Sequence, residues 1–284
     1  MQLLATTPFL APPDLRPLAL ETLSAIAQAC FVSLPAVLAF AKPLGLTEEP
    51  FETWARAGFL HVGTVHLDPL LAEETRYVAL TPAGAREMGL SGRAVQGISA
   101  ARLKRSSQKR AHDVFVGDTA LAVLTAARFH GVDLVGLEAD DRRLGTSAVL
   151  ERIGKPPCRV ALQADLFFAV REDGKLRGFL VEVDRGTIAP LRMAEKYAAY
   201  LTWWRSGGPE RDFGLRALQV LTVARDARRL ERLHEAALGA NHGKRSGFLL
   251  FLDQKDVTPA DAGRLKEPVV RVLGEELARP LFHA

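Results

Sequence analysis

Three carboxylates stand within the apolar runs of the sequence. Glu182 and Asp184 alternate with valines at the end of one run, and Asp165 stands inside an earlier run. Because side chains alternate across a strand, Glu182 and Asp184 share a face, which Asp165 reaches if the two runs pair in register. Clustered carboxylates repel unless protons or a cation neutralise them. The pattern therefore predicts either a divalent-ion site or an acidic face that is solvated or paired with nearby arginines.

Two strands and a helix must position these side chains. Residues 162–170 and 178–184 have the near-continuous apolar content of buried strands. Asp173-Gly174 between them favours a tight hairpin turn. After Asp184 the period changes, and from Ile188 the apolar residues recur at helical spacing as far as Leu201. We therefore expect a hairpin followed by a helix.

This segment resembles the replication-relaxation proteins of bacterial plasmids and related mobile elements. In that family an Asp on one strand is followed by a strand ending Glu-x-Asp-Arg-Gly-Thr and a helix with Lys-x-x-x-Tyr. The matching residues are Asp165, the run from Glu182 to Thr187, and Lys196 with Tyr200. The segment is also similar to the restriction-endonuclease-like core, whose signature is an Asp, a gap and Glu-x-Lys. Asp184 stands where that signature has its lysine.

The resemblance implies a metal-dependent site whose chemistry is open. Asp165, Glu182 and Asp184 are the candidate catalytic ligands of Mg²⁺ or Mn²⁺, because these hard cations prefer oxygen ligands. Lys196, on the following helix, is the candidate catalytic cation that relieves charge on a phosphate. With aspartate in place of the usual lysine, the domain either cleaves DNA or binds it without cleavage.

The whole chain is predicted to be an α/β (α+β) protein. Its 284 residues, 48% hydrophobic and 25% charged, are enough for two modest soluble domains. Residues 1–90 are predicted to form a winged helix-turn-helix, with helices near 18–27, 34–40 and 51–57, strands at 59–65 and 77–80, and a last helix capped by Thr81-Pro82. Residues 91–112 are predicted to form a basic linker.

The predicted third segment, residues 113–284, is a restriction-endonuclease-like mixed-sheet domain. Pattern alone predicts a helix at 114–129, a strand at 132–137, an irregular or briefly helical stretch at 142–157 and then the hairpin and its helix to about 205. A strand at 218–223, a helix at 227–238, a strand at 247–252 and a helix-containing tail at 259–281 complete the prediction. This order is shared by several α/β folds.

The distribution of charge points to DNA, although not through the winged helix itself. Residues 1–90 hold five Lys and Arg against nine Asp and Glu, and Arg56 is the one candidate phosphate contact on the expected recognition segment. The linker has six cations and no acidic residue. These candidate DNA contacts are Arg93, Arg102, Lys104, Arg105, Lys109 and Arg110. The alternatives are a merely solvated linker and a winged helix used for protein contact or dimerisation.

Other chemistry has little support in the sequence. The seven histidines show no paired metal spacing, and the two cysteines lack a partner motif. No phosphate-binding loop is present. Trp203 and Trp204 are candidates for base stacking or core packing, and core packing is favoured because adjacent helical residues point about 100° apart. Residues 1–13 have neither a signal-peptide pattern nor a membrane span, so a cytoplasmic location is expected.

The sequence therefore predicts a DNA-binding protein that acts in replication, relaxation or transfer of a plasmid or mobile element. The alternatives are a metal-dependent nicking endonuclease and a winged-helix transcriptional regulator. The expected partners are double-stranded DNA and either a second copy of the chain or a replication or relaxation protein. No membrane contact is expected.

Overall fold

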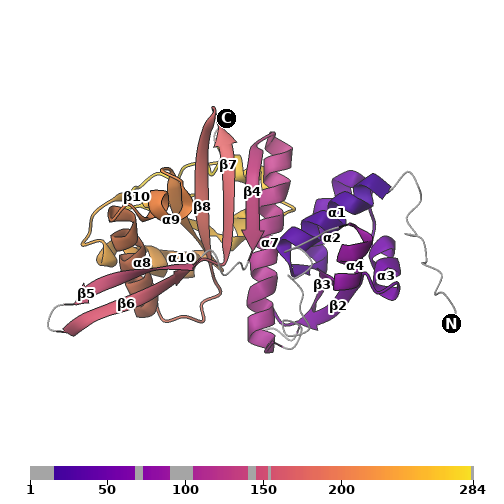
Figure 1. The fold of residues 1–284 in the computed structure, drawn as a ribbon, viewed down its shortest axis with the longest axis horizontal. Helices are drawn as coiled ribbons and strands as arrows, with labels where there is room; N and C mark the ends of the chain where they lie inside the picture. Colours follow the sequence, from indigo (N-terminus) through magenta and orange to yellow (C-terminus); the bar gives the residue numbers. More distant parts are fainter. Residues whose placement is uncertain (1–15, 68–72, 90–104, 140–144, 153–154, 283–284) are drawn as a thin grey trace. The chain divides into compact units, whose positions relative to one another are not determined.

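The fold is a mixed α/β arrangement, as predicted from the sequence, and the chain divides into two compact units. The computed structural model describes residues 16–67, 73–89, 105–139, 145–152 and 155–282. The two units are Met1–Leu121 and Ala122–Ala284. Figure 1 shows the helices and strands of both units.

The first unit combines short helices with a three-stranded antiparallel sheet in the order β1-β3-β2. Phe31, Trp54 and Tyr77 are almost fully buried and form its aromatic core. The elements are α1 (Arg16–Ala29), β1 (Val32–Ser33), α2 (Leu34–Ala41), a 3₁₀ turn η1 (Lys42–Leu44), α3 (Glu49–Arg56), β2 (Leu60–Val65), β3 (Thr75–Leu80) and α4 (Pro82–Glu87). The predicted helices and strands are therefore present, and β1 is an addition that the sequence pattern did not indicate.

The first half of a long helix, α7 (Ser107–His130), completes the first unit. Gly117 lies so close to β1 that a Cβ atom there would be 1.7 Å from the carbonyl oxygen of Phe31. The next residue, Asp118, accepts a hydrogen bond from the backbone N–H of Ser33 at 2.8 Å. Loss of hydration raises the pKa of Asp118 to about 7. The helix begins seven residues before the predicted start at 114, so the end of the predicted linker is helical.

The second unit is built on a six-stranded mixed sheet in the order β11-β10-β9-β8-β7-β4. Strands β8, β9 and β10 are parallel, and the other pairs are antiparallel. A separate ribbon pairs β5 with β6 and packs on α8 (Figure 1). The elements are β4 (Asp133–Ala139), β5 (Gly145–Arg152), β6 (Lys155–Gln163), β7 (Leu166–Glu172), β8 (Lys175–Asp184), α8 (Pro190–Arg205), α9 (Gly208–Phe213), β9 (Leu218–Ala224), α10 (Ala227–Ala240), β10 (Ser246–Asp253), η3 (Gln254–Asp256), η4 (Ala262–Lys266) and β11 (Arg271–Leu273).

The two faces of the large sheet have different coverings. Leu180, Val220 and Phe251 belong to the buried cluster that also holds the inner residues of α8 and α10. On the opposite face, Phe168 stacks on Phe179 and meets Phe282 of the tail edge to face. Glu182 and Asp184 alternate with the residues of this second face, so they point toward α8 and α10.

The predicted hairpin is confirmed, and two other local predictions are wrong. Asp173 and Gly174 have φ values of 49° and 73° and link β7 to β8 in a two-residue turn. The stretch predicted as irregular or helical at 142–157 contains β5 and the start of β6. The two prolines at the start of β6 are compatible with a strand, because proline is tolerated in a two-stranded ribbon where every strand is an edge. Ala164 and Asp165 interrupt the strand predicted at 162–170.

In the tail predicted at 259–281, the helical part is the five-residue 3₁₀ helix η4, and the short strand β11 follows it. Within the described residues, no helix combines the length and the apolar content that crossing a membrane requires.

Candidate functional site

Asp165 and Glu182 face each other across neighbouring strands. Leu166 pairs with Val181, so Asp165, one residue earlier, stands at the register position opposite Glu182. Asp165 lies in the bend between β6 and β7, and its Oδ2 accepts a hydrogen bond from the backbone N–H of Val183 at 2.9 Å. The structure thus brings together the first two carboxylates that the sequence singled out.

Helix α8 places a cation and a phenol on the carboxylate of Glu182. The Nζ atom of Lys196 donates to Glu182 Oε2 at 2.6 Å and to the carbonyl oxygen of Gln163 at 3.2 Å. The hydroxyl of Tyr200, one helical turn later, donates to Glu182 Oε1. Lys196 therefore reaches the acidic end of the sheet although it follows Asp184 by twelve positions. We define Asp165, Glu182, Lys196 and Tyr200 as the carboxylate–lysine cluster.

Burial dominates the electrostatics of this cluster. Only 4% of Glu182 is exposed. Loss of hydration, opposed by the charge of Lys196 and reinforced by that of Asp165, raises the pKa of Glu182 from 4.5 to about 7. Burial and the neighbouring Glu182 raise the pKa of Tyr200 well above its usual value. Glu182 can therefore gain or lose a proton near neutral pH, while Tyr200 stays protonated as a hydrogen-bond donor.

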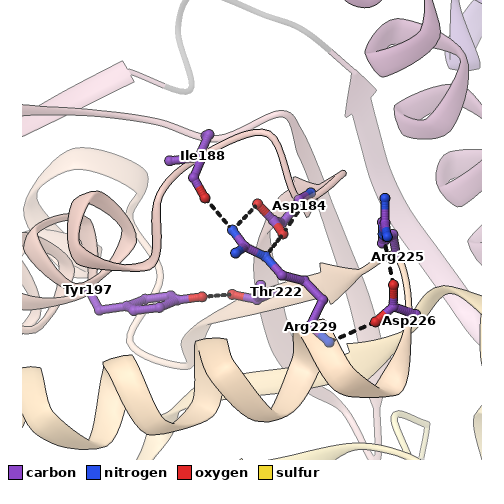
Figure 2. Close-up of polar contacts among 8 residues, drawn as sticks. Asp184, Ile188, Tyr197, Thr222, Arg225, Asp226 and Arg229 are labelled. Atoms are coloured by element: carbon purple, nitrogen blue, oxygen red, sulfur yellow. Dashed lines mark hydrogen bonds and ion pairs between the residues drawn. The ribbon is translucent and has the colours of Figure 1, made fainter. Parts of the chain in front are cut away.

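Asp184 belongs to a different set of contacts (Figure 2). Arg229, in the first turn of α10, donates through Nε to Asp184 Oδ2 at 2.6 Å and through Nη2 to Oδ1 at 3.1 Å. The same Nη2 donates to the carbonyl oxygen of Ile188, and the N–H of Gly186 donates to Asp184 Oδ2. Both side chains are buried, at 9% and 2% exposure. This bidentate pair ties the end of β8 to α10 and to the loop that precedes α8.

The start of α10 is fixed by a cap beside that pair. Asp226 Oδ1 accepts the N–H of Arg229 at 2.7 Å, and Asp226 Oδ2 accepts Nε of Arg225 at 2.7 Å (Figure 2). Nearby, the hydroxyls of Tyr197 and Thr222 are 3.1 Å apart in the core. Because α10 is capped and packed, the guanidinium of Arg229 is held against Asp184.

The hydrogen bonds of the three carboxylates decide which of them are available to bind a divalent ion. Asp165 and Glu182 are adjacent oxygen donors, whereas Arg229 engages both oxygens of Asp184. Glu182 is engaged by Lys196 and Tyr200, so an ion at this position would take the place of Lys196 on Oε2. Among the described residues, no three His, Cys, Asp or Glu side chains are grouped so as to hold a metal. The side chains that this site has for metal or phosphate chemistry are therefore the carboxylates of Asp165 and Glu182 and the ammonium of Lys196.

The predicted DNA contacts are distributed unevenly. Arg93, Arg102 and Lys104 lie outside the described residues. Arg105 forms an ion pair with Asp113 at 2.7 Å, so its charge is compensated. Lys109 is exposed in the first turn of α7, and Arg110 is close enough to His61 to contribute to the lowering of the pKa of His61, after burial. Arg56 is exposed at the end of α3.

A sequence model described as replication-relaxation matches residues 68–217, which is more than half of the chain. The chain belongs to the replication-relaxation family. The matched region of this family member runs from the β2–β3 connection to the residue before β9, so it includes all four residues of the carboxylate–lysine cluster. Membership supports a role in the replication or relaxation of plasmid or mobile-element DNA. No curated protein and no solved structure matches the chain.

Two residues of this replication-relaxation protein were missed as site residues. Tyr200 ends the Lys-x-x-x-Tyr motif and lies one turn from Lys196, which is the spacing that places both side chains on one helix face. Arg229 had a weaker signal: it follows an Asp that suits a helix cap, but its burial against Asp184 depends on how α10 packs beside β8.

Proposed function

We propose that the chain binds duplex DNA during replication or relaxation of a plasmid or mobile element, and that its first unit is a winged helix. The arrangement of that unit carries the proposal: three helices, then a β2–β3 hairpin that also pairs with β1, then α4. In a helix-turn-helix, the recognition helix enters the major groove and flanking elements contact phosphates. By position α3 is the recognition helix and β2–β3 the wing.

Ion pairs reduce the acidity of the proposed recognition helix. Arg76, on β3, donates to Glu48 at 2.6 Å and also to Glu52. Two of the carboxylates that would repel DNA are thus held against a cation of the wing. These pairs are partly exposed, so they add little stability, but they lower the local negative charge. Arg56 and Lys109 remain as exposed cations of this unit that suit phosphate contacts.

Duplex affinity is expected to fall with salt, because bound cations release counterions from DNA. Each linker cation that contacts a phosphate contributes roughly 0.9 to the slope of log K against log salt. Replacing Arg102, Lys104 and Lys109 with Gln should therefore flatten the slope by up to about 2.7. Arg105 is kept because its pair with Asp113 is structural. Fluorescence anisotropy with a labelled duplex at several salt concentrations measures the slope.

The control removes the same charge from the second unit. It replaces three cations of the tail with Gln: Lys266, Arg271 and Arg279. Two of these already pair with glutamates, so their loss should leave the slope unchanged. An unaltered slope in the linker variant would identify the segment as a solvated linker. Tight binding of one duplex sequence by a dimer would instead favour a transcriptional regulator.

A second function, metal-dependent strand cleavage, is favoured by the 2.6 Å contact between Lys196 and Glu182. Asp165 and Glu182 would hold Mg²⁺ or Mn²⁺, and Asp184 would keep its structural pair with Arg229. The bound ion would supply polarisation of the phosphodiester and activation of water. Lys196 would pair with the developing negative charge on the phosphate, and Tyr200 would orient Glu182 by donating to Oε1.

Nicking of supercoiled plasmid with manganese tests this second function. Lys196→Met and the Asp165→Ala, Glu182→Ala double variant should each lose about 100-fold or more in nicking rate. Lys255→Met, at an exposed lysine whose ammonium is 3.8 Å from Asp253, is the matched control and should nick normally. Equal manganese binding and equal cleavage in the wild type and the double variant would show that Asp165 and Glu182 are structural.

A further inference from the structure

A pocket of about 570 Å³ lies at the other end of the sheet from the carboxylate–lysine cluster. Lys175 and Arg177 line it from the start of β8, Gln219 from the start of β9, and Gly247 and Phe248 from the start of β10. The cluster, by contrast, is near the end of β8. The size is that of pockets that bind small organic ligands, and the whole pocket is formed within the second unit.

An exposed tryptophan forms one side of this pocket. Trp204 is 41% exposed and stacks on Phe248, with ring centroids 5.2 Å apart and an interplanar angle of 18°. The protein has three tryptophans, and Trp54 and Trp203 are almost completely buried. Trp203 packs in the core and donates its Nε1–H to Asp212 at 2.7 Å. Core packing therefore explains Trp203, whereas the ring of Trp204 is held in place and open to a ligand.

The polar side of the pocket is a chain of hydrogen bonds across four strands. Arg177 donates to Glu172 at 2.5 Å and to Gln219 Oε1 at 3.3 Å, and it lies over the ring of Phe179 at 5.1 Å. Gln219 in turn donates to the carbonyl oxygen of Gly247 at 2.6 Å. The charge of Glu172 is thus compensated by Arg177. A planar guanidinium and an amide, both fixed, suit the edge of a heterocyclic base.

The rim of the pocket has an excess of positive charge. Exposed cations in the pocket wall or within two residues of it in sequence are Arg171, Lys175, Arg205, Arg216 and Arg245. The acidic residues close to them are Asp133, Glu172, Asp173 and Glu210. Ion pairs join Asp133 to Arg171, Glu172 to Arg177 and Glu210 to Arg216, which leaves Lys175, Arg205 and Arg245 against Asp173. A ligand with an aromatic ring and a negatively charged group fits this combination of aromatic wall, polar edge and cationic rim.

We propose that this pocket binds one unpaired nucleotide of single-stranded DNA, with its base stacked on Trp204 and its phosphates along the rim. The proposal rests on the proposed DNA-binding function. It selects a single strand because a base inside a duplex is stacked on its neighbours and cannot present both faces to a protein ring. Replication and relaxation both expose unpaired strands, so single-stranded DNA would be available to the protein.

The test is the affinity of the full chain for a labelled oligothymidine of about ten nucleotides. Trp204→Ala should weaken this affinity about tenfold or more, and Trp204→Phe should retain most of it, because a stacked base contributes that much in other single-strand binders. Phe129→Ala removes an aromatic side chain that is more exposed than Trp204, at 73%, and does not line the pocket, so it is the control. Oligothymidine should also protect the wild-type fluorescence from acrylamide quenching, since Trp204 is the exposed tryptophan.

The outcomes separate this inference from the proposed function. Unchanged oligothymidine affinity in Trp204→Ala, with duplex binding intact, overturns the pocket assignment alone. Failure of the wild type to bind any DNA overturns both proposals. If thymidine monophosphate binds as tightly as the oligonucleotide, the occupant is a free nucleotide and the assignment to single-stranded DNA is wrong.

Discussion

Replacing Asp184 with alanine is expected to destabilise the second unit by about 3–5 kcal/mol, the cost of leaving a buried charge without its partner. Arg229 is 9% exposed, and two of its nitrogens donate to the Asp184 carboxylate. After the substitution, the Arg229 guanidinium would lose both hydrogen bonds to Asp184 and keep the one to the carbonyl oxygen of Ile188. Urea unfolding followed by tryptophan fluorescence measures the change, because two of the three tryptophans are in this unit.

Two further variants show whether the pairing is the cause. Glu231→Ala breaks an exposed ion pair between α10, the helix that carries Arg229, and Arg271 of β11, and it should cost less than about 1 kcal/mol. Combining Asp184→Leu with Arg229→Met removes both buried charges, so it should recover most of the lost stability. A double variant as unstable as Asp184→Ala would mean that packing, not the unpaired charge, determines the cost.

This role for Asp184 illustrates what the sequence could and could not predict. Alternation along β8 placed Glu182 and Asp184 on one face, and the structure agrees. Alternation does not determine which helix covers each residue. Lys196 and Tyr200 from α8 contact Glu182, whereas Arg229 from α10 contacts Asp184, forty-five positions along the chain. Long-range packing of this kind has no local signature, so a carboxylate expected as a ligand proved to be engaged by an arginine.

The fold shows the same division between local and long-range information. Thr81 caps a helix as its side chain predicted, and Asp173-Gly174 forms the expected turn. The β5–β6 ribbon was missed because its strands gain stability from each other and from α8, which overrides the prolines at its edge. Strand β1 has two residues, too few for any pattern to indicate.

The protonation of Glu182 is expected to make the stability of the fold depend strongly on pH. Its pKa is about 7 in the folded chain against an ordinary value of 4.5, so between these pH values the folded state binds more protons than the unfolded state. Stability contributed by protonated Glu182 is therefore complete below about pH 4.5 and is lost as the pH rises through 7. The total loss is about 3 kcal/mol for a shift of this size.

Glu182→Gln should flatten the fall in stability between pH 5 and pH 8, because glutamine carries no titrating proton. Urea unfolding at each pH measures the change. Asp118→Asn is the matched variant in the first unit, because the pKa of Asp118 is also about 7. It should remove a separate part of the fall in stability with pH. An unchanged slope in Glu182→Gln would show that Lys196 keeps Glu182 ionised at these pH values.

Tyr200→Phe distinguishes these two accounts of Glu182. The hydroxyl of Tyr200 donates to the carboxylate and thereby lowers the pKa of Glu182. Its removal should shift the midpoint of the pH-dependent loss upward, whereas a Glu182 held fully ionised by Lys196 would show no midpoint to shift. The carboxyl ¹³C shift of Glu182, followed by NMR from pH 5 to pH 9, reports that midpoint directly. A carboxyl shift that stays constant from pH 5 to pH 9 in both proteins would mean that the charge of Lys196 outweighs burial, and that Glu182 is ionised throughout this range.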